Sequence, residues 1–274
     1  ITSGTLRVGS ASALGSASGG VTVADGAVLD LRGVSMTNTN PLNIKGTGIS
    51  NSGALINSSA TAGAYAGAIT LSGDTFIAGG SGIIELNSGT PISGAHALTL
   101  GGDQGGQVSS DIGGTVTTLT KSGSGTWTLS GAGLYSGATT ISAGTLKLGA
   151  MGAIPDSSSV TVTGTLDLNG KAETVAGISG TGRITSSAAG TPVLTIGGNN
   201  ASTSFSGQIE NGIATSVGIT KIGSGVLTLS GTNTFTGPVI VNGGGLTLAN
   251  GLAIHDSVAV TLSASGVALT LSGS

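Results

Sequence analysis

Two histidines are the side chains of this chain best suited to proton transfer near neutral pH. They are His96 and His255, far apart in the sequence, and Asp256 directly follows His255. Serine is abundant, so a Ser–His–Asp set that activates a nucleophile can be considered. However, adjacent residues of an extended chain point to opposite faces, and both histidines stand among residues typical of turns. We therefore predict two solvent-facing loop histidines and no catalytic residues.

The densest group of charged residues is Asp167, Lys171, Glu173 and Arg183. Enzymes that cleave polysaccharides need grouped carboxylates, or a carboxylate beside a basic group, on one face. Nothing in the spacing of these four residues singles out such a pair, so we predict that the chain is not an enzyme. A carbohydrate-binding or carbohydrate-cleaving β-helix is kept as the alternative, and it requires a groove with grouped acids and aromatics.

Metal and cofactor chemistry has little to build on in this sequence. Residues 101–105 read GGDQG, which is part of a calcium-binding pattern, but such sites need the pattern to recur and it occurs once. We interpret it as a turn. The chain has no cysteine for thiolate ligands or disulfides. We expect no metal site and no cofactor.

The elements that must position all these side chains follow from a phrase that the chain repeats. Residues 119–149 read LTKSGSGTWTLSGAGLYSGATTISAGTLKLG, and residues 219–249 read ITKIGSGVLTLSGTNTFTGPVIVNGGGLTLA. The two segments align without a gap. Self-similarity on this scale indicates a chain made by stacking one structural unit, with a larger repeat of about 100–140 residues.

The alignment of the two segments places a lysine opposite a lysine and a tryptophan opposite a leucine. Lys121 and Lys221 occupy the same position, which suits either a ladder of binding lysines or a solvated charge that keeps a sheet edge soluble. We favour the solvated charge. Trp127 aligns with Leu227, so we predict that it fills the core or a corner and is no platform for a ligand.

Composition excludes several other classes of protein. The 274 residues include 53 glycines, six aromatic residues and 7% charged residues, with a net charge of −3. The eight basic residues form no patch, so we expect no nucleic-acid partner. Apolar residues occur in short alternating runs, none near the roughly 18 residues of a membrane-spanning helix, so we expect no direct membrane insertion.

The alternating runs predict many short strands, bounded by the Gly, Ser, Asn and Asp residues that tight turns need. We expect strands at residues 5–8, 21–23, 28–31, 69–71, 83–86, 98–100, 126–129, 139–141, 145–148, 160–162, 165–168, 193–196, 226–229, 239–241, 246–248, 258–262 and 268–271. No stretch shows helical spacing with caps, so no significant helix is expected. Strands this short, with few aromatics, favour a β-solenoid (parallel β-helix) over a sandwich or propeller. We predict one continuous solenoid over residues 1–274, with sub-modules at about 1–118, 119–218 and 219–274.

The phrase at residues 123–149 resembles the autotransporter-associated β-strand repeat, which is also called the passenger-associated transport repeat. Residues 65–71, 194–200 and 205–209 look like the spacers between such repeats. Two departures are expected to matter little: Gly133 stands where the other copy has Asn233, and Gly245 stands where the other copy has Thr145. The resemblance implies a right-handed, extracellular β-helix exported by a cell of Gram-negative type, acting mostly as stalk and folding scaffold.

These observations lead to a structural function. We predict a stalk or fibre-forming part of a large exported autotransporter-type surface protein or adhesin, located outside the cell or on the bacterial cell surface. Residues 1–9 match residues 141–149, so the chain begins in mid-repeat and has no evident polar cap. The expected partners are neighbouring coils of the same or an identical chain, stacked end to end, with an unknown surface or matrix ligand.

Overall fold

The computed structural model describes residues 1–272, which fall into two compact units. Unit 1 comprises Ile1–Gly137 and Ala143–Leu146, and unit 2 comprises Ala138–Ser142 and Lys147–Ser274. Within each unit the strand ladders are parallel, and each strand pairs with a strand one coil further along the chain. Each unit is therefore a parallel β-solenoid. This confirms the predicted all-β solenoid class; its right hand and its three sub-modules stay predictions.

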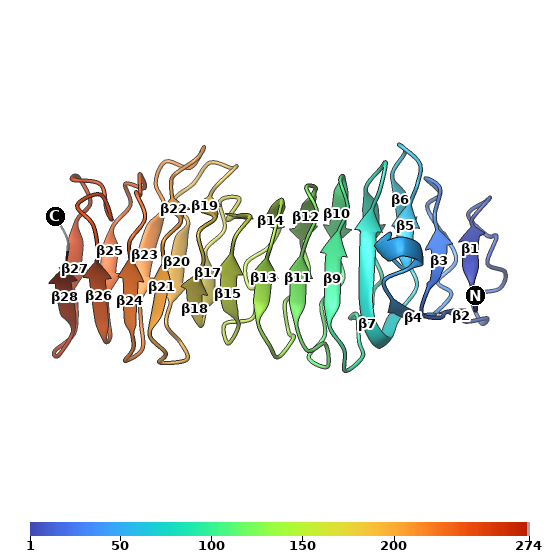
Figure 1. Ribbon diagram of the computed structural model, residues 1–274, viewed down its shortest axis with the longest axis horizontal. Helices are drawn as coiled ribbons and strands as arrows, with labels where there is room; N and C mark the ends of the chain where they lie inside the picture. Colours follow the sequence, from blue (N-terminus) through green and yellow to red (C-terminus); the bar gives the residue numbers. More distant parts are fainter. Residues whose placement is uncertain (273–274) are drawn as a thin grey trace. The chain divides into compact units, whose positions relative to one another are not determined.

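Unit 1 is built from three columns of strands (Figure 1). The first column is β1 (Gly4–Arg7), β3 (Ala27–Asp30), β5 (Leu55–Asn57), β7 (Ile69–Gly79), β9 (Leu98–Gly101) and β11 (Leu119–Lys121). The second is β6 (Gly63–Tyr65), β8 (Ile84–Leu86), β10 (Gly105–Val108) and β12 (Thr126–Leu129). The third is β2 (Val21–Val23), β4 (Leu42–Gly46) and the first half of β7. The long strand β7 joins two columns because its start pairs with β4 and its end with β5.

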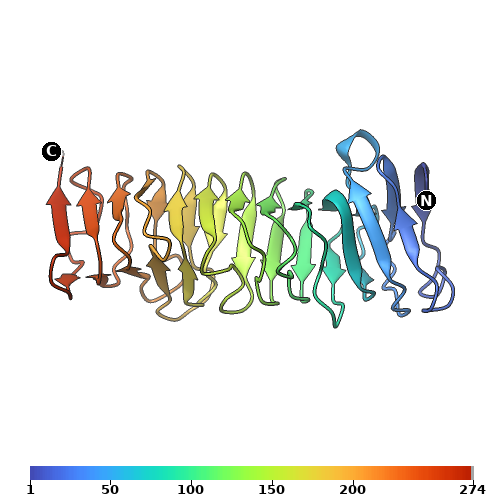
Figure 2. The ribbon, with the colours of Figure 1, turned by 90° about the horizontal axis from the view of Figure 1, so that it is seen from below.

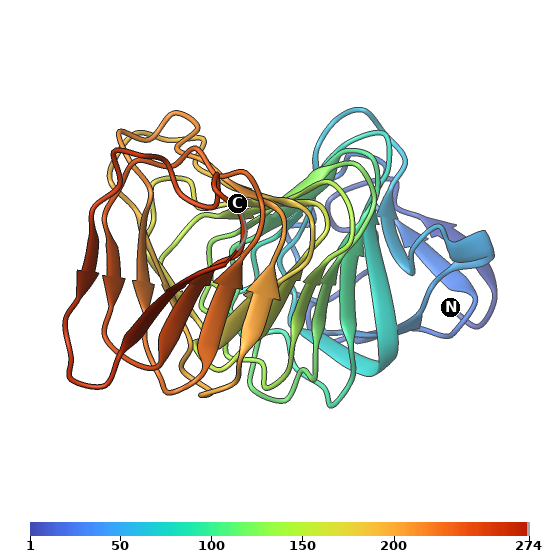
Figure 3. The same cartoon turned by 60° about the vertical axis from the view of Figure 1, so that its left-hand side comes forward.

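Unit 2 holds four shorter columns. They are β13 (Thr139–Ile141), β15 (Ser159–Val162) and β18 (Gly177–Ser179); then β16 (Thr165–Asp167), β19 (Arg183–Thr185) and β22 (Gln208–Ile209); then β17 (Glu173–Val175), β20 (Val193–Ile196), β23 (Gly218–Lys221), β25 (Val239–Val241) and β27 (Val260–Leu262); and β21 (Thr203–Phe205), β24 (Val226–Leu229), β26 (Gly245–Leu248) and β28 (Ala268–Leu271). Figure 2 shows these strands stacked as successive arrows, and Figure 3 shows the last ones, orange to red, as two separate sheets. The remaining strand, β14 (Thr145–Leu148), contains the division between the units.

The core of each unit is a set of ladders made by equivalent residues of successive coils. In β20, Leu194 and Ile196 are buried while the residues between them are half-buried, which is the alternation the sequence predicts. Leu194 pairs with Ile219, and Ile219 pairs with Val239, so the apolar side chains stack on one another. Burying each such side chain contributes about 1.5–3 kcal/mol, and an isolated coil would lose both of its stacking neighbours.

Helical structure is limited to one turn among the described residues. It is the 3₁₀ turn η1 (Ile49–Asn51), drawn as the short blue coil in Figure 1. The prediction of no significant helix is thus confirmed. No helix in the described part of the chain is long and apolar enough to span a membrane.

Most predicted strands are present within one or two residues, and most of the strands that the sequence reading missed have identifiable reasons. The predicted strand at 69–71 continues to Gly79, across Gly73 and Asp74, where a turn would be expected. Strand β4 has a clear apolar alternation in Leu42 and Ile44 and was simply missed. Most of the other missed strands lack such an alternation or carry a charged residue inward; they are β5, β6, β10, β11, β17, β18, β19, β21, β22 and β23. In these strands the neighbouring coils supply hydrogen bonds and packing that override local preference.

The coils differ in length. The pairing of Thr165 with Arg183 closes a coil in 18 residues, whereas the pairing of Leu42 with Ile69 takes 27. The extra residues form the loops that protrude from the columns, so the strands keep their register although the loops vary.

Candidate functional site

The most unusual side chains of the solenoid are two buried lysines at equivalent positions of the repeat. Lys121 ends β11 and Lys221 ends β23, and their exposed fractions are 0% and 1%. Lys221 continues an interior ladder, because it pairs with Ile196 and Val241. The prediction of a solvated charge at a sheet edge is therefore wrong. The strand alternation turns the last residue of each of these two strands inward, and the turn that follows accepts hydrogen bonds from its ammonium group.

Each ammonium group sits in a cage of three backbone carbonyls. Lys121 Nζ donates to the carbonyl oxygens of Ser122 (2.7 Å), Gly123 (2.9 Å) and Ala143 (3.0 Å). The lysine thus closes the turn that follows its own strand. It also holds the turn of the next coil, 22 residues away.

The second cage has the same construction. Lys221 Nζ donates to the carbonyl oxygens of Ile222 (2.7 Å), Gly223 (3.0 Å) and Gly243 (3.3 Å), the last again 22 residues away. An ammonium group has three N–H donors, and each finds one acceptor in both cages. The geometry is therefore a property of the repeat.

Glycines make the close approach possible. Gly144 and Gly244 both have φ of +61°, a left-handed conformation that glycine adopts without steric cost. A Cβ atom added to Gly144 would lie 2.5 Å from the carbonyl oxygens of Gly123 and Gly125, and 2.7 Å from Lys121 Nζ. The lysine and the glycines therefore stand at the positions of the repeat that one cage requires.

Burial lowers the pKa of both lysines, that of Lys121 to about 8. A pKa of about 8 still leaves Lys121 mainly protonated at neutral pH, where the three carbonyls require the charged form. The cage therefore uses the lysine as a fixed internal cation that ties two coils together.

The sequence match covers these cages. Residues 119–148 and 219–248 match the passenger-associated transport repeat family. The chain carries two passenger-associated transport repeats. No curated protein and no solved structure matches the chain. The match confirms the resemblance read from the sequence, and each passenger-associated transport repeat begins with the strand that ends in a cage lysine.

The two passenger-associated transport repeats differ at the position of Asn233, and the difference is structural. In the second repeat, Asn233 is buried, accepts a hydrogen bond from Ile209 N–H (2.7 Å) and donates to the carbonyl of Ala253. In the first, Gly133 pairs directly with Ile112 as a parallel β-bridge. This departure therefore has a structural effect. The Asn233 amide links its own coil to the coils before and after it, whereas the Gly133 bridge links two coils.

The charged group predicted from the sequence is not gathered into one site. Asp167 is buried in β16 and accepts hydrogen bonds from the backbone N–H groups of Asn169 (2.9 Å) and Ser187 (2.8 Å). Lys171 is half-buried in the turn that follows β16, and its backbone N–H bonds to Leu168. Glu173 lies in β17, a strand of another sheet, and both of its carboxylate oxygens are buried without a hydrogen-bond partner.

Arg183 has a partner that the sequence reading missed. Its guanidinium group bonds the carboxylate of Glu210, which also accepts a hydrogen bond from Thr185 Oγ1 (2.8 Å). Burial alone would raise the pKa of Glu210, but the hydrogen bonds from Arg183 and Thr185 and the charge of Arg183 outweigh it and lower that pKa. The two residues are 27 apart in sequence, and no local pattern links them; only the coil length brings them together.

Aspartate at the corner after a strand is a second link between coils. Asp30, like Asp167, is buried at the end of its strand and accepts a hydrogen bond from Arg32 N–H (3.1 Å). Its carboxylate also binds Ser58 of the next coil, through the backbone N–H (3.0 Å) and the hydroxyl (2.6 Å). The shared sequence Leu-Asp-Leu-x-Gly at 29–33 and 166–170 is the signal that could have predicted this role.

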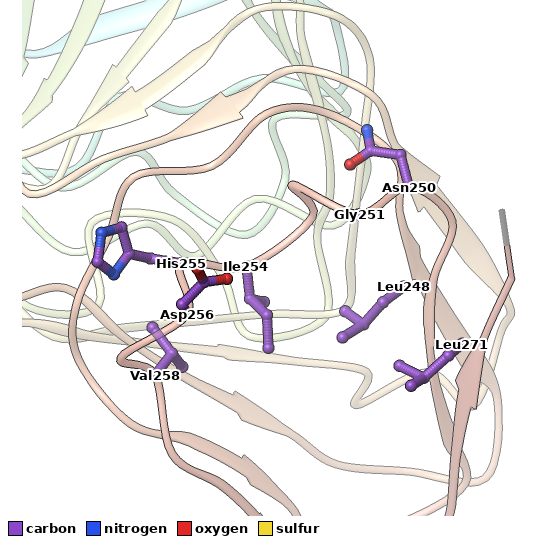
Figure 4. Close-up of a pocket in the computed structure, with 8 residues that line it drawn as sticks. All are labelled: Leu248, Asn250, Gly251, Ile254, His255, Asp256, Val258 and Leu271. Carbon is purple, nitrogen blue, oxygen red and sulfur yellow. The ribbon is translucent and has the colours of Figure 1, made fainter. Parts of the chain in front are cut away.

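Both histidines lie in loops, as predicted. The His96 side chain is 39% exposed, and its Nδ1 lies 3.8 Å from Asp74 Oδ1. His255 is exposed, and its Nδ1 lies 2.8 Å from Ser257 Oγ within one turn. In Figure 4 the His255 ring points away from Leu248 and Leu271, which line a hollow of about 300 Å³.

The turn at His255 has an equivalent turn 100 residues earlier, in which Pro155 takes the place of the histidine. Val258 N–H bonds the carbonyl of His255 (2.9 Å), and Ser158 N–H bonds the carbonyl of Pro155 (2.8 Å). These two turns are 100 residues apart and equivalent in the repeat. The contact between His255 and Ser257 therefore belongs to a turn that the chain also builds with proline.

The remaining sequence expectations concern Trp127 and residues 101–105. Trp127 is fully buried, and its indole N–H donates to the carbonyl of Gly101 (2.9 Å), which confirms that it fills the core. Residues 102–104 form a bend between β9 and β10, with Gly102 at φ +90°, which confirms the turn. Among the described residues no three His, Cys, Asp or Glu side chains group as metal ligands.

One polar hollow of about 530 Å³ lies on unit 1. Its ionisable lining residues are Asp25, Lys45, Asp74 and His96. Asp74 is well exposed and also accepts a hydrogen bond from Ala97 N–H (3.0 Å). The hollow is the place on unit 1 where a polar ligand could meet acids and bases from successive coils.

Proposed function

We propose that the chain is a structural stalk segment in the passenger of a large exported surface protein, located on the bacterial cell surface or outside the cell. The two passenger-associated transport repeats support an exported passenger. The observation that carries the structural role is the lysine cage: the charged group common to both repeats is buried and bonded to its own and the next coil. The hydrogen bonds of each ammonium group hold neighbouring coils together, and the group is buried away from any ligand in solution.

Localisation is tested on intact cells that express the native protein. We expect external protease to release, or surface-directed antibody to detect, peptides of residues 119–149 without lysis. The denatured mass of the polypeptide that carries them should be far above the 25.7 kDa of this segment. Detection only after the cells are opened would contradict the proposal.

The carbohydrate-binding or carbohydrate-cleaving alternative has less support. Five of the six aromatic side chains are fully buried, namely Trp127, Tyr65, Tyr135, Phe205 and Phe235. Phe76 is half-buried and stands alone, so the aromatics form no stacking platform for a sugar chain. We therefore propose a segment without catalysis. A glycan array is the direct test: specific binding that is lost in Asp74→Asn and His96→Ala, within the polar hollow of unit 1, would favour the alternative.

A further inference from the structure

Glu173 is a carboxylic acid in a place that the solenoid otherwise fills with aliphatic side chains. It starts the interior ladder that continues with Leu194, Ile219 and Val239, and it is 3% exposed. Neither carboxylate oxygen has a hydrogen-bond partner within normal geometry. Ionisation of such a group is costly, because water is removed and no counter-charge replaces it.

A similar sequence motif in unit 1 is followed by an apolar residue instead of a carboxyl group. Residues 29–37 read LDLRGVSMT and residues 166–174 read LDLNGKAET, so Met36 corresponds to Glu173. Met36 is also buried, with an exposed fraction of 3%. The motif is thus followed by a buried residue in both copies, and only in unit 2 is that residue titratable.

The surroundings of Glu173 oppose its negative charge more than they support it. Asp156, exposed in the preceding loop, repels the charge, while the backbone N–H groups of Thr174, Ala153 and Gly152 offset part of the cost. The strand β20, which pairs with β17, presents no ionisable side chain.

The nearest cation of the same sheet is already engaged. Lys221 lies two strands away on the adjacent interior ladder, and its ammonium group is held by three carbonyls. A hollow of about 250 Å³ beside Glu173, lined by Met151, Gly152 and Asp156 among others, gives water a route to the carboxyl group when the coil loosens.

We propose that Glu173 is a proton-dependent latch: its coil packs tightly over the neutral carboxyl group and loosens when that group ionises. This inference is independent of the proposed stalk function. Burial raises the pKa of Glu173 from 4.5 to about 7. Because the pKa in the folded chain is above that in the unfolded chain, the contribution to stability is fully present below pH 4.5 and is lost as the pH rises through 7.

The test compares urea unfolding of the wild-type chain and Glu173→Gln at pH 5.0 and 7.5. We expect the two unfolding equilibrium constants to agree within a few-fold at pH 5.0. At pH 7.5 the wild-type constant should exceed that of the variant by on the order of 100-fold, the size that follows from the pKa values above. Glu173→Met, which copies unit 1, should behave like Glu173→Gln and serves if the amide does not pack.

Two further variants separate the latch from a general effect of charge. Glu210→Gln should not change the pH dependence between 5.0 and 7.5, because the pKa of Glu210 is lowered and its stabilisation is lost only as the pH falls through that lower value. Asp156→Asn should move the wild-type transition to lower pH, since it removes the repulsion. A ratio of wild type to Glu173→Gln that stays constant from pH 5.0 to 7.5 would overturn the proposal.

Discussion

Burying a lysine costs free energy unless each N–H donor of its ammonium group finds an acceptor. The two repeat lysines meet that condition with backbone carbonyl oxygens. Each cage takes two carbonyls from the turn directly after the lysine and one from the next coil. Since the acceptors are backbone atoms, the cage depends little on the identity of the intervening side chains. Ser122 and Ile222 can therefore differ while the interaction is the same.

Removing a cage lysine should destabilise the chain more than removing a surface lysine. We expect Lys121→Met to lower the free energy of unfolding by about 3 kcal/mol, because each carbonyl left without a donor costs about 1–3 kcal/mol and the lost burial of a charge offsets part of this. Urea unfolding measures the difference. The control is Lys45→Met, an exposed position, where the change should stay within about 0.5 kcal/mol. Equal effects of the two substitutions would contradict the cage.

Chemical labelling tests the burial itself. With acetic anhydride at pH 8.5, the native chain should acetylate Lys45 fast and Lys121 and Lys221 slowly, as read by peptide mass spectrometry. The lowered pKa of the cage lysines increases the fraction of free amine, so protection at this pH can only come from inaccessibility. After denaturation all three should react alike. Labelling of Lys121 in the native chain at the rate of Lys45 would contradict the structure.

At the scale of the element, the turns are specified more tightly than the strands. Strands tolerate Leu, Ile, Val, Thr, a lysine and even a glutamate on the inward face, as Leu194, Lys221 and Glu173 show. The turns after the cage lysines tolerate less, because their glycines combine a left-handed backbone with contacts that leave no space for a Cβ atom. The turn residues therefore do more than the strand residues to fix how one coil aligns with the next.

Substitution of a cage glycine should be costly although it adds only one methyl group. Gly144→Ala should reduce the free energy of unfolding by about 2 kcal/mol or more, from about 1 kcal/mol of backbone strain and the clash with Gly123 and Gly125. Gly89→Ala is the matched control in the same unit, because no atom lies within 4 Å of its added Cβ. The urea midpoints should separate the two variants clearly; a neutral Gly144→Ala would show that the turn can relax.

At the scale of the whole molecule, stability should follow from the sum of coils and their interfaces, as in other repeat proteins. The equivalent residues Lys121 and Lys221 are 100 residues apart, so this length preserves the phase of the repeat. If 100 residues are deleted, equivalent positions of the repeat are joined. Each strand then pairs with a strand equivalent to its original partner. A cut that also removes the cage strand would leave a turn where the column needs a strand.

Internal deletions test this phase. A chain that lacks residues 119–218 should fold with the β-sheet circular dichroism signal of the parent and a cooperative urea transition. A chain that lacks residues 119–221 should lose the cooperative transition, because the cut also removes the cage strand β23 and leaves a turn where its column needs a strand. Similar unfolding curves for the two deletions would mean that the phase of the repeat does not control the fold.

The sequence by itself determined the class of fold and the repeat. Alternating apolar residues and turn glycines are local signals, and the spacing of Leu129 and Leu229, or of Trp127 and Leu227, is visible in one chain. The solenoid, the short strands, the buried Trp127 and the loop histidines could all be predicted because each depends on neighbours in sequence.

Only the tertiary structure decided what the polar residues do. The cage partner of Lys121 is 22 residues away, the partner of Arg183 is 27 residues away, and Glu173 is buried without a counter-charge. These distances depend on the length of each coil, which varies from 18 to 29 residues and has no local signal. A charge that looks solvated in the sequence can therefore be buried, because the coil above it supplies the groups that complete its surroundings.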